Sequence, residues 1–188
     1  YLDWSSPSNL TKTTLVSQIS RRLKGDASSI GHAQIGWHCD MGNGKYETSS
    51  TGQTGQNGDE GFKVVRDGWG LGVLDTVFTD GYLESDQEVL NKMKAADKNG
   101  NFAWMAIKTN KDSCMDMVNF VKEYDKRGAA INYGFPVEPL KYEGAGCTSF
   151  ANAALSQTHL DIGVMKGWIR KVKIPFKYMG KLDYVIPN

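Results

Sequence analysis

Apolar residues recur along the chain at the two spacings that distinguish strands from helices. The clearest strand signal surrounds Asn43-Gly44, a dipeptide typical of two-residue hairpin turns, and predicts antiparallel strands over 29–39 and 45–50. One face of the first strand is apolar and is expected to face the core, with Ala33, Ile35, Trp37 and Cys39. The other face, which we expect to look into solvent or a cleft, carries His32, Gln34, Gly36 and His38.

Helical spacing and capping signals predict four helices. They are expected from Asn9 or Thr11 to Lys24, from the capping box Ser85–Glu88 to Asn99-Gly100, from Asp112 or Ser113 to Gly128, and from Cys147 onward. Further short strands are expected at 62–65, 70–78, 102–108, 171–178 and 184–185, with a mobile glycine-rich loop at 51–61 and an extended segment at 131–143.

These elements predict an α+β fold, in which a mainly antiparallel sheet packs against helices. At 188 residues the chain is long enough for one sizeable core, so we expect a single domain over residues 1–188. Lys and Arg total 22 against 21 Asp and Glu, which gives no electrostatic reason for nucleic acid or an anionic membrane as the main partner.

Neither a membrane segment nor a cofactor is expected from the sequence. No apolar run approaches the roughly 20 residues that cross a bilayer, and the first residues lack the charged and apolar regions of a signal peptide. The chain shows no metal-ligand spacing and no phosphate-binding loop. We therefore expect a monomer that works without a cofactor.

Three cysteines, Cys39, Cys114 and Cys147, are too few and too scattered for a disulfide scaffold or a zinc site. Their odd number predicts a free thiol. A Cys39–Cys114 bridge in an oxidising compartment would leave Cys147 as that thiol, but the sequence does not fix the pairing. Cys114 also fits the apolar stripe of its helix, which favours a position in the core.

Cys147 follows the glycine-rich turn Glu143-Gly144-Ala145-Gly146 and lies in the first turn of the helix that it opens. There the unpaired backbone N–H groups and the helix macrodipole favour an anion. Thiols in such places titrate at roughly 3.5–7.5 instead of about 8.5, which makes a nucleophile at neutral pH. The alternative is a buried core cysteine, because its helical spacing is shared by Phe150, Ala151 and Ala154.

A nucleophilic thiol needs an imidazole to move the proton, and His32 is the best candidate. Along a continued helix, His159 would lie roughly 18 Å from Cys147 at 1.5 Å per residue, too far for a hydrogen bond. His38 stands roughly 20 Å along the strand from His32, so only one of the two can serve. A surface or hydrogen-bonded histidine is the alternative for either residue.

Three motifs, in this order, resemble the NlpC-type family of papain-like cysteine peptidases and amidases. They are Gly31-His32-Ala33-Gln34-Ile35-Gly36, the hairpin Gly42-Asn43-Gly44-Lys45, and Gly146-Cys147-Thr148-Ser149-Phe150-Ala151. Because the histidine precedes the cysteine, the chain resembles the circularly permuted branch, which includes lecithin:retinol acyltransferase-like enzymes. The resemblance implies a papain-like, permuted NlpC-type fold with Cys147 as nucleophile and His32 as base.

In that family a third polar residue, on the strand after the hairpin, orients the histidine. Pairing across the turn predicts that four residues share the face of His32, namely Glu47, Ser49, Thr51 and Gln53. Gln53 falls closest to His32 and is the predicted third residue, with Glu47 as its rival and a dyad without a third residue as the alternative. For the oxyanion, the backbone N–H of Cys147 is the expected donor, with the hydroxyl of Tyr142 as a weaker candidate.

The resemblance implies a cysteine-dependent hydrolase that cleaves an amide bond in a peptide or peptidoglycan stem through a thioacyl-enzyme. Such a bacterial enzyme would be secreted, periplasmic or delivered as an effector. The permuted branch also implies a lipid or thioester acyl hydrolase or acyltransferase, which would need an exposed apolar rim from Trp69, Leu71 or Trp168. The non-enzymatic alternative is an inactive binding module, with a Cys147 of ordinary reactivity or a His32 too far away to assist.

Overall fold

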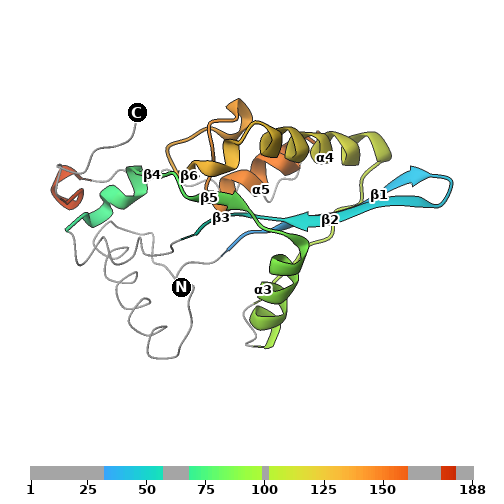
Figure 1. Cartoon of the computed structure of the whole chain (residues 1–188), viewed down its shortest axis with the longest axis horizontal. Coiled ribbons are helices and arrows are strands. Elements are labelled where there is room, and N and C mark those ends of the chain that lie inside the picture. The colour runs from blue at the N-terminus through green and yellow to red at the C-terminus, as the bar shows by residue number, and fades with distance from the viewer. Residues whose placement is uncertain (1–31, 57–67, 99–101, 161–174, 181–188) are drawn as a thin grey trace.

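The computed structural model describes residues 32–56, 68–98, 102–160 and 175–180, and within them the chain folds into short strands and helices (Figure 1). The strands form three antiparallel pairs, β1 with β2, β3 with β5 and β4 with β6. The fold is therefore of the expected α+β class. The predicted first helix and the strands at 62–65 and 184–185 lie outside the described residues.

The hairpin predicted at Asn43-Gly44 is confirmed, with β1 over Ile35–Gly42 and β2 over Lys45–Thr51. Both turn residues have positive φ, 54° at Asn43 and 72° at Gly44, as a type I′ turn requires. The tip of the hairpin carries a β-bulge, because the register shifts between Asp40 and Gly42. One extra residue in one strand reverses which face every later pair occupies.

The bulge makes the predicted faces of β2 wrong. Ile35 pairs with Thr51 and Cys39 with Glu47, so these odd-numbered residues of β2 share the apolar face of β1 rather than the face of His32. The burial of Thr51 and Cys39 agrees with this register. The residues of β2 that share the face of His38 are even-numbered. Among them, the hydroxyl of Thr48 forms a 2.7 Å hydrogen bond with Nδ1 of His38.

A second ribbon continues from the first. β3, over Gln53–Gly55, is separated from β2 only by Gly52, and it pairs with β5, over Gly81–Leu83. The prediction of a mobile loop at 51–61 is therefore wrong for the described part of that range, because Thr51 and Gln53 lie in strands and are buried. The third pair joins β4, over Val77–Phe78, to β6, over Tyr133–Gly134.

Three other strand predictions are wrong in the described residues. Residues 70–75 form the 3-10 helix η1, Gly70–Asp75, and only Val77–Phe78 is extended. Residues 102–108 have no regular structure, and their aromatic side chains Phe102 and Trp104 are exposed, because β propensity is realised only against a pairing partner. The end of the predicted strand 171–178 is the 3-10 helix η4, Phe176–Tyr178.

The three predicted helices within the described residues are confirmed. The capping box forms at the start of α3, Asp86–Lys98, where Ser85 Oγ and backbone N–H both donate to Glu88 Oε2. Asn110 caps α4, Lys111–Lys126, and Gly128 follows it with φ of 69°. The cysteine helix is α5, Cys147–Ser156. The segment before it contains two further 3-10 turns, η2 at Ala129–Ile131 and η3 at Pro139–Lys141.

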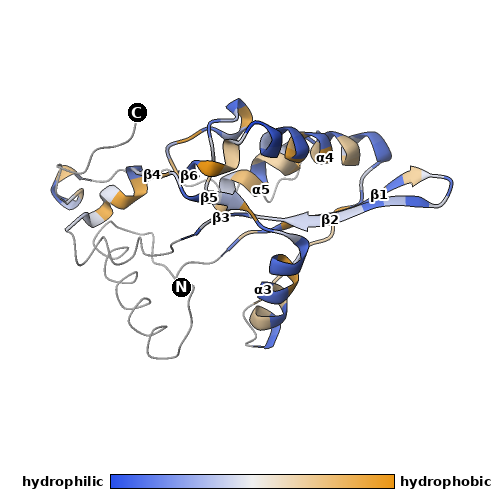
Figure 2. Ribbon diagram, in the orientation of Figure 1, coloured by the Kyte–Doolittle hydropathy of each residue, from blue (hydrophilic) through white to orange (hydrophobic). Residues whose placement is uncertain are grey.

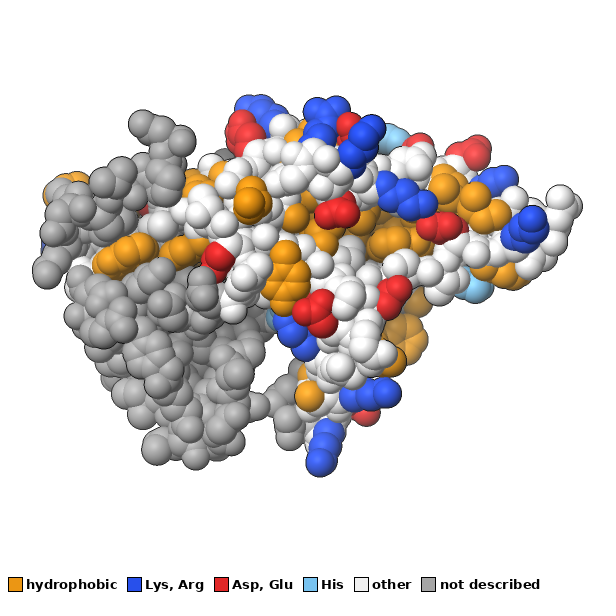
Figure 3. Space-filling model, in the orientation of Figure 1, with side chains coloured by type: hydrophobic (Ala, Val, Ile, Leu, Met, Phe, Trp, Pro, Cys, Tyr) orange, Lys and Arg blue, Asp and Glu red, His pale blue; other side chains and the backbone are white. Residues whose placement is uncertain are grey.

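The core lies where α4 and α5 pack against the first strand. Its buried side chains come mainly from these two helices, and include Met117, Phe120, Val121, Tyr124, Phe150 and Ala154, with Ile35 from β1. Figure 2 shows α5 as largely hydrophobic and most of the β1–β2 hairpin as hydrophilic. On the face seen in Figure 3, side chains of both charges are interspersed. The hairpin is joined to α4 by a disulfide between Cys39 and Cys114, whose Cα atoms lie 5.7 Å apart.

Candidate functional site

Cys147 is the first residue of α5, and the backbone before it is held in a fixed path. Gly144 has φ of 131°, and a Cβ there would collide with the backbone of Asn132. The N–H of Ala145 donates to Asn132 O at 3.1 Å, and the N–H of Gly146 donates to Ser149 Oγ at 2.9 Å. The thiol is the free cysteine of the chain and is half-buried.

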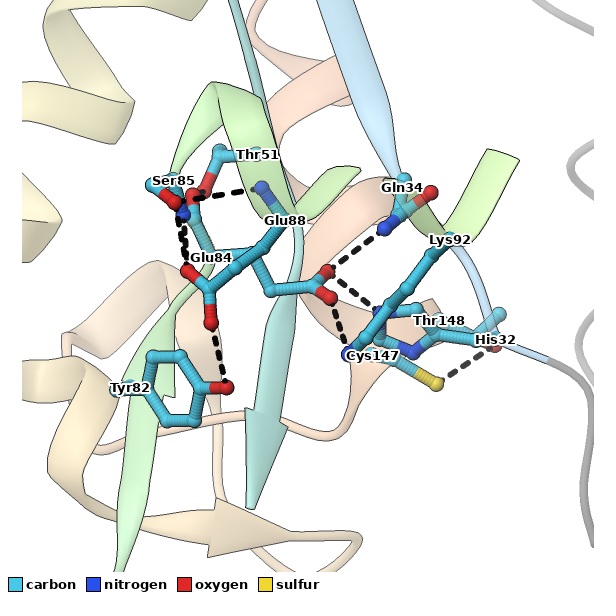
Figure 4. A network of polar contacts seen from close by, with 10 residues as sticks. All are labelled: His32, Gln34, Thr51, Tyr82, Glu84, Ser85, Glu88, Lys92, Cys147 and Thr148. Carbon is cyan, nitrogen blue, oxygen red and sulfur yellow. Dashed lines mark hydrogen bonds and ion pairs between the residues drawn. The ribbon is translucent and has the colours of Figure 1, made fainter. Parts of the chain in front are cut away.

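His32 and Cys147 are brought together, as the sequence predicts. Interaction with Cys147 raises the pKa of His32, and interaction with His32 and with the backbone of Ala33, the residue after it, lowers the pKa of the Cys147 thiol. Thr148 Oγ1 lies 3.8 Å from the sulfur on the helix itself (Figure 4). The segment that leads into β1 therefore supplies both an imidazole and a backbone donor to one thiol.

The polar partner of His32 is Glu84, the residue after β5. Its Oε2 lies 2.6 Å from Nε2 of His32 and accepts a 3.0 Å hydrogen bond from Gln34, while its Oε1 pairs with the ammonium of Lys92 (Figure 4). The side chain of Glu84 is 0% exposed, against 21% for His32. Because Nε2 is engaged by Glu84, the other ring nitrogen, Nδ1, is left for the thiol.

Gly52 explains how a residue from β5 reaches this position. The N–H of Glu84 donates to Gly52 O at 2.9 Å, so the two residues lie side by side on neighbouring strands. A Cβ on Gly52 would lie 2.5 Å from Glu84 Oε2 and 3.0 Å from Ala33 O. The strand after the hairpin thus has no side chain beside His32, and the carboxylate of Glu84 fills that space.

The three site groups hold one another in charged form. Burial alone would raise the pKa of the Cys147 thiol, but hydrogen bonds from His32 and Ala33 outweigh it and lower that pKa from 9.0 to about 7. Burial would lower the pKa of His32, yet its hydrogen bonds to Cys147 and Glu84 raise it from 6.5 to about 9. Burial would likewise raise the pKa of Glu84, but hydrogen bonds from His32, Lys92 and Gln34 lower it from 4.5 to about 2.

Between pH of about 7 and 9 the site therefore holds a thiolate beside an imidazolium, with a carboxylate behind the imidazolium. A thiolate is the nucleophilic form of cysteine. An imidazolium can give its proton to a leaving group, and a buried carboxylate fixes the tautomer and orientation of the ring. The arrangement has the parts that acyl transfer through a covalent thioacyl intermediate requires.

Gln53, the predicted third residue, does not contact His32. It is buried in β3, where its Nε2 donates to the carbonyls of Ala130 at 3.0 Å and Asn132 at 2.9 Å, and its Oε1 accepts from Tyr124 at 2.7 Å. The prediction of its contact is wrong because it assumed a hairpin without a bulge. With the observed register, the residue on the His32 face is Gly52 and not Gln53.

The remaining candidates lie away from the thiol. His38 stacks on Tyr46 with ring centroids 4.3 Å apart, and His159 lies 3.5 Å from Asp116 in an exposed ion pair. Glu47 pairs with Lys122 at 2.9 Å. The ring of Tyr142 packs between the aromatic cluster of Phe120 and Tyr124 and the guanidinium of Arg127, which lies 4.1 Å from its centroid.

Glu84 and Lys92 are the site residues that sequence reasoning missed. Glu84 directly precedes the Ser85–Glu88 capping box, so the start of α3 was visible but the strand before it was not. A carboxylate at the end of a short buried strand was the available signal. Lys92 lies two turns into α3, and nothing local distinguishes it from other helical lysines.

Comparison of the chain with protein-family models, with curated proteins and with solved structures finds no match. Within the described residues, no helix is both long and apolar enough to cross a membrane. The same residues contain no group of three or more His, Cys, Asp or Glu side chains placed to hold a metal ion.

Proposed function

We propose that the protein is a cysteine-dependent hydrolase that cleaves an amide bond in a peptide or a peptidoglycan stem. The proposal rests on one observation. The imidazole of His32 lies between the thiol of Cys147 and the buried carboxylate of Glu84 and interacts with both. The three residues come from three separate segments of the chain. Structural cysteines are buried and inert, and do not combine these neighbours with a lowered thiol pKa.

The reaction follows from the positions of these groups. The Sγ thiolate of Cys147 attacks the carbonyl carbon, and the new C–S bond pushes an electron pair onto the carbonyl oxygen. The backbone N–H of Cys147, in the first turn of α5, is the nearest helix donor for that oxyanion. When the intermediate collapses, the C–N bond breaks and Nδ1 of His32 gives its proton to the departing amine.

Water completes the cycle. His32, now neutral, takes a proton from water as the oxygen attacks the thioester carbonyl, and the C–S bond breaks to release a carboxylic acid and the Cys147 thiolate. Glu84 remains an anion throughout and accepts the Nε2–H hydrogen bond, which is strongest while the imidazole is protonated. The same chemistry serves a papain-like domain of permuted NlpC type, which is the fold that we propose for this chain.

The substrate class rests on the resemblance of the Gly31–Gly36 and Gly146–Ala151 motifs to NlpC-type enzymes. The Cys39–Cys114 disulfide supports action outside a reducing compartment, because such bonds persist in secreted and periplasmic proteins. We therefore propose a bacterial enzyme that is secreted, periplasmic or delivered to the cell wall of another cell, and that acts as a monomer without a cofactor.

The two alternatives gain less support. A lipid or thioester hydrolase would need an apolar rim, but Leu71 is buried and Trp69 stacks on Phe78, while Trp168 lies outside the described residues. An inactive binding module would keep its histidine away from the thiol, and here His32 is close enough to lower the pKa of that thiol.

Digestion of purified peptidoglycan tests the proposal directly. The protein should release new amino groups from sacculi or from soluble stem peptides, with the cleaved bond located by mass spectrometry. Cys147→Ser should abolish the release of amino groups, because the serine hydroxyl does not ionise in the pH range in which the thiol does. Thr148→Ser should retain this release. A protein whose Cys147 is reactive but which leaves every stem-peptide amide intact would contradict the proposed substrate class.

A further inference from the structure

Lys92 is a charged residue that reaches the buried end of the site from α3. Its ammonium pairs with Oε1 of Glu84, whereas Oε2 is taken by His32 and Gln34. Glu84 is 0% exposed, while Lys92 is 47% exposed, so the pair joins a buried carboxylate to a helix at the surface. In the close view, Lys92 and His32 approach different oxygens of the same carboxylate (Figure 4).

We propose that Lys92 is a positioning residue, which holds Glu84 as a fixed anion and thereby keeps the lone pair of His32, once the ring is neutral, on the Nδ1 that faces Cys147. The inference rests on the proposed function, because it concerns how the same site is kept ready for catalysis. Lys92 acts on the reaction through Glu84 and does not itself touch the reacting atoms.

Glu84 has to stay charged throughout the proposed catalytic cycle. Within the described residues, only His32 and Lys92 form ion pairs with Glu84. When His32 is neutral, as it is after it protonates the leaving group, Lys92 is the remaining cation on this buried carboxylate. A buried anion without a cation is costly, and its protonated form becomes favoured.

Protonation of Glu84 would reverse the hydrogen bond to the ring. The ionised carboxylate accepts a hydrogen bond from Nε2–H, so the neutral ring keeps its lone pair on Nδ1, the nitrogen that faces the thiol. A protonated carboxyl would donate to Nε2 instead, which would place the ring hydrogen on Nδ1. In that tautomer His32 could not take a proton from Cys147 or from water.

Neighbouring groups make the cation more necessary. The negative charge of Glu84 acts to raise the pKa of Glu88, which lies in α3, and of the Tyr82 hydroxyl, which lies in β5. A second carboxylate disfavours ionisation of the first. On the other side, Cys147 adds a negative charge when it is a thiolate, and His32 offsets that charge only while it is protonated.

The phase of α3 fixes where Lys92 points. Asp86, Val89 and Lys92 follow one another at three-residue spacing, so each is a neighbour of the next on the helix surface. Asp86 binds the hydroxyls of Ser49 and Ser50, and Val89 is the one residue of α3 that is a buried hydrophobic. Lys92 is the next position in this row, and α3 as a whole extends away from the strands (Figure 1).

The experiment compares Lys92→Met, which keeps the methylene stem but removes the ammonium, with Lys92→Arg and with Lys94→Met. Lys94 is an exposed lysine of the same helix and serves as the matched control. The first readout is the pKa of His32 from the NMR titration of its Cε1–H resonance, assigned with His32→Ala. The second is the rate of Cys147 alkylation by iodoacetamide at pH 7.5, which needs no substrate.

In Lys92→Met we expect the pKa of His32 to fall by at least about half a unit, because Glu84 without its ammonium partner takes up a proton more readily and stabilises the imidazolium less. Alkylation should slow by about three- to tenfold, Lys92→Arg should restore it to within about twofold, and Lys94→Met should match the unaltered protein. In a Glu84→Gln background, Lys92→Met should change the rate by less than about twofold, because the residue acts through Glu84.

A His32 pKa that rises or stays unchanged, or an equal loss of rate in the Glu84→Gln background, would overturn the positioning role. Thermal unfolding shows whether each variant folds. If Lys92→Met does not fold, Lys92→Gln, which keeps a donor without the charge, should give the same fall of the His32 pKa. If the unaltered Cys147 titrates as an ordinary thiol, the proposed function and this inference are both wrong. If it titrates near pH 7 and Lys92→Met changes nothing, only this inference is wrong.

Discussion

Nε2 of His32 lies 2.6 Å from Oε2 of Glu84, although the two residues are 52 positions apart in the chain. The contact exists because β3 and β5 pair and because Gly52, between β2 and β3, has no side chain to occupy the space. The imidazole is thus held between a carboxylate and a thiol, and each neighbour raises its pKa.

Glu84→Gln should reduce the reactivity of Cys147 at pH 7.5 by at least about tenfold and lower the pKa of His32 from about 9. The amide keeps a hydrogen bond to the ring but removes the charge that stabilises the imidazolium. Glu47→Gln is the matched control, since Glu47 was the rival candidate and pairs instead with Lys122. Equal rates for Glu84→Gln and Glu47→Gln, measured by alkylation, would show that Glu84 has no part in the site.

Gln53→Met should destabilise the protein without shifting the pKa of His32. The substitution leaves the Tyr124 hydroxyl and the carbonyls of Ala130 and Asn132 without their buried partner, at a cost of about 2–4 kcal/mol. Urea denaturation gives the stability, and NMR titration gives the pKa. The opposite result, unchanged stability with a lowered His32 pKa, would restore Gln53 as the residue that orients the histidine.

Gly52→Ala should displace Glu84, because the added methyl would lie 2.5 Å from its Oε2. We expect a loss of Cys147 reactivity comparable to that of Glu84→Gln, in a protein that still folds. Gly36→Ala is the control in β1, where a Cβ would meet only ordinary contacts at 3.6 Å. Retention of full reactivity by Gly52→Ala, with Gly36→Ala unchanged, would argue that the carboxylate does not need this space.

Removal of the disulfide should cost stability and spare the chemistry. Cys39 and Cys114 are 75 residues apart, and closing a loop of that length in the unfolded chain is worth about 4 kcal/mol in the chain-entropy account. The double variant Cys39→Ala/Cys114→Ala should unfold at lower denaturant, while its folded form alkylates Cys147 at the original rate. A parallel fall of reactivity and stability would mean that the bridge also shapes the site.

Several elements could be predicted because their signals are local. The Asn43-Gly44 turn, the Ser85–Glu88 capping box and the helix opened by Cys147 each lie within a few residues of sequence. The apolar face of the first strand was predicted for the same reason, although β1 begins at Ile35 and His32 precedes it. His32 and Cys147 were then matched by their chemistry, and the structure places them in contact.

The third site residue could not be predicted in the same way. A bulge at the hairpin tip is set by local packing, and it moves every residue of β2 to the opposite face. A register predicted without the bulge is wrong by one residue, so it placed Gln53 beside His32, where the structure has Gly52. Glu84 arrives through the pairing of β3 with β5, a contact between distant segments that no local pattern records. Residues 70–78 were misjudged because apolar content alone does not separate a strand from a 3-10 turn.

The pH dependence of hydrolysis should follow the two central pKa values. Below pH of about 7 the thiolate of Cys147 takes up a proton, so the rate falls as the pH falls. Above about 9 the imidazolium of His32 loses the proton that the leaving group needs, so the rate falls again. A bell-shaped profile between these limits is expected, and a rate that keeps rising above pH 9 would contradict the role of His32 as acid.

The most direct measurement is the rate of iodoacetamide alkylation as a function of pH, with peptide mapping of the label and His32→Ala alongside. The account predicts that Cys147 carries the label, that its rate has an inflection at a pKa near 7, and that His32→Ala moves this pKa above about 8.5. A Cys147 that stays unlabelled in the folded protein, or that titrates as an ordinary thiol with or without His32, would contradict the catalytic pair.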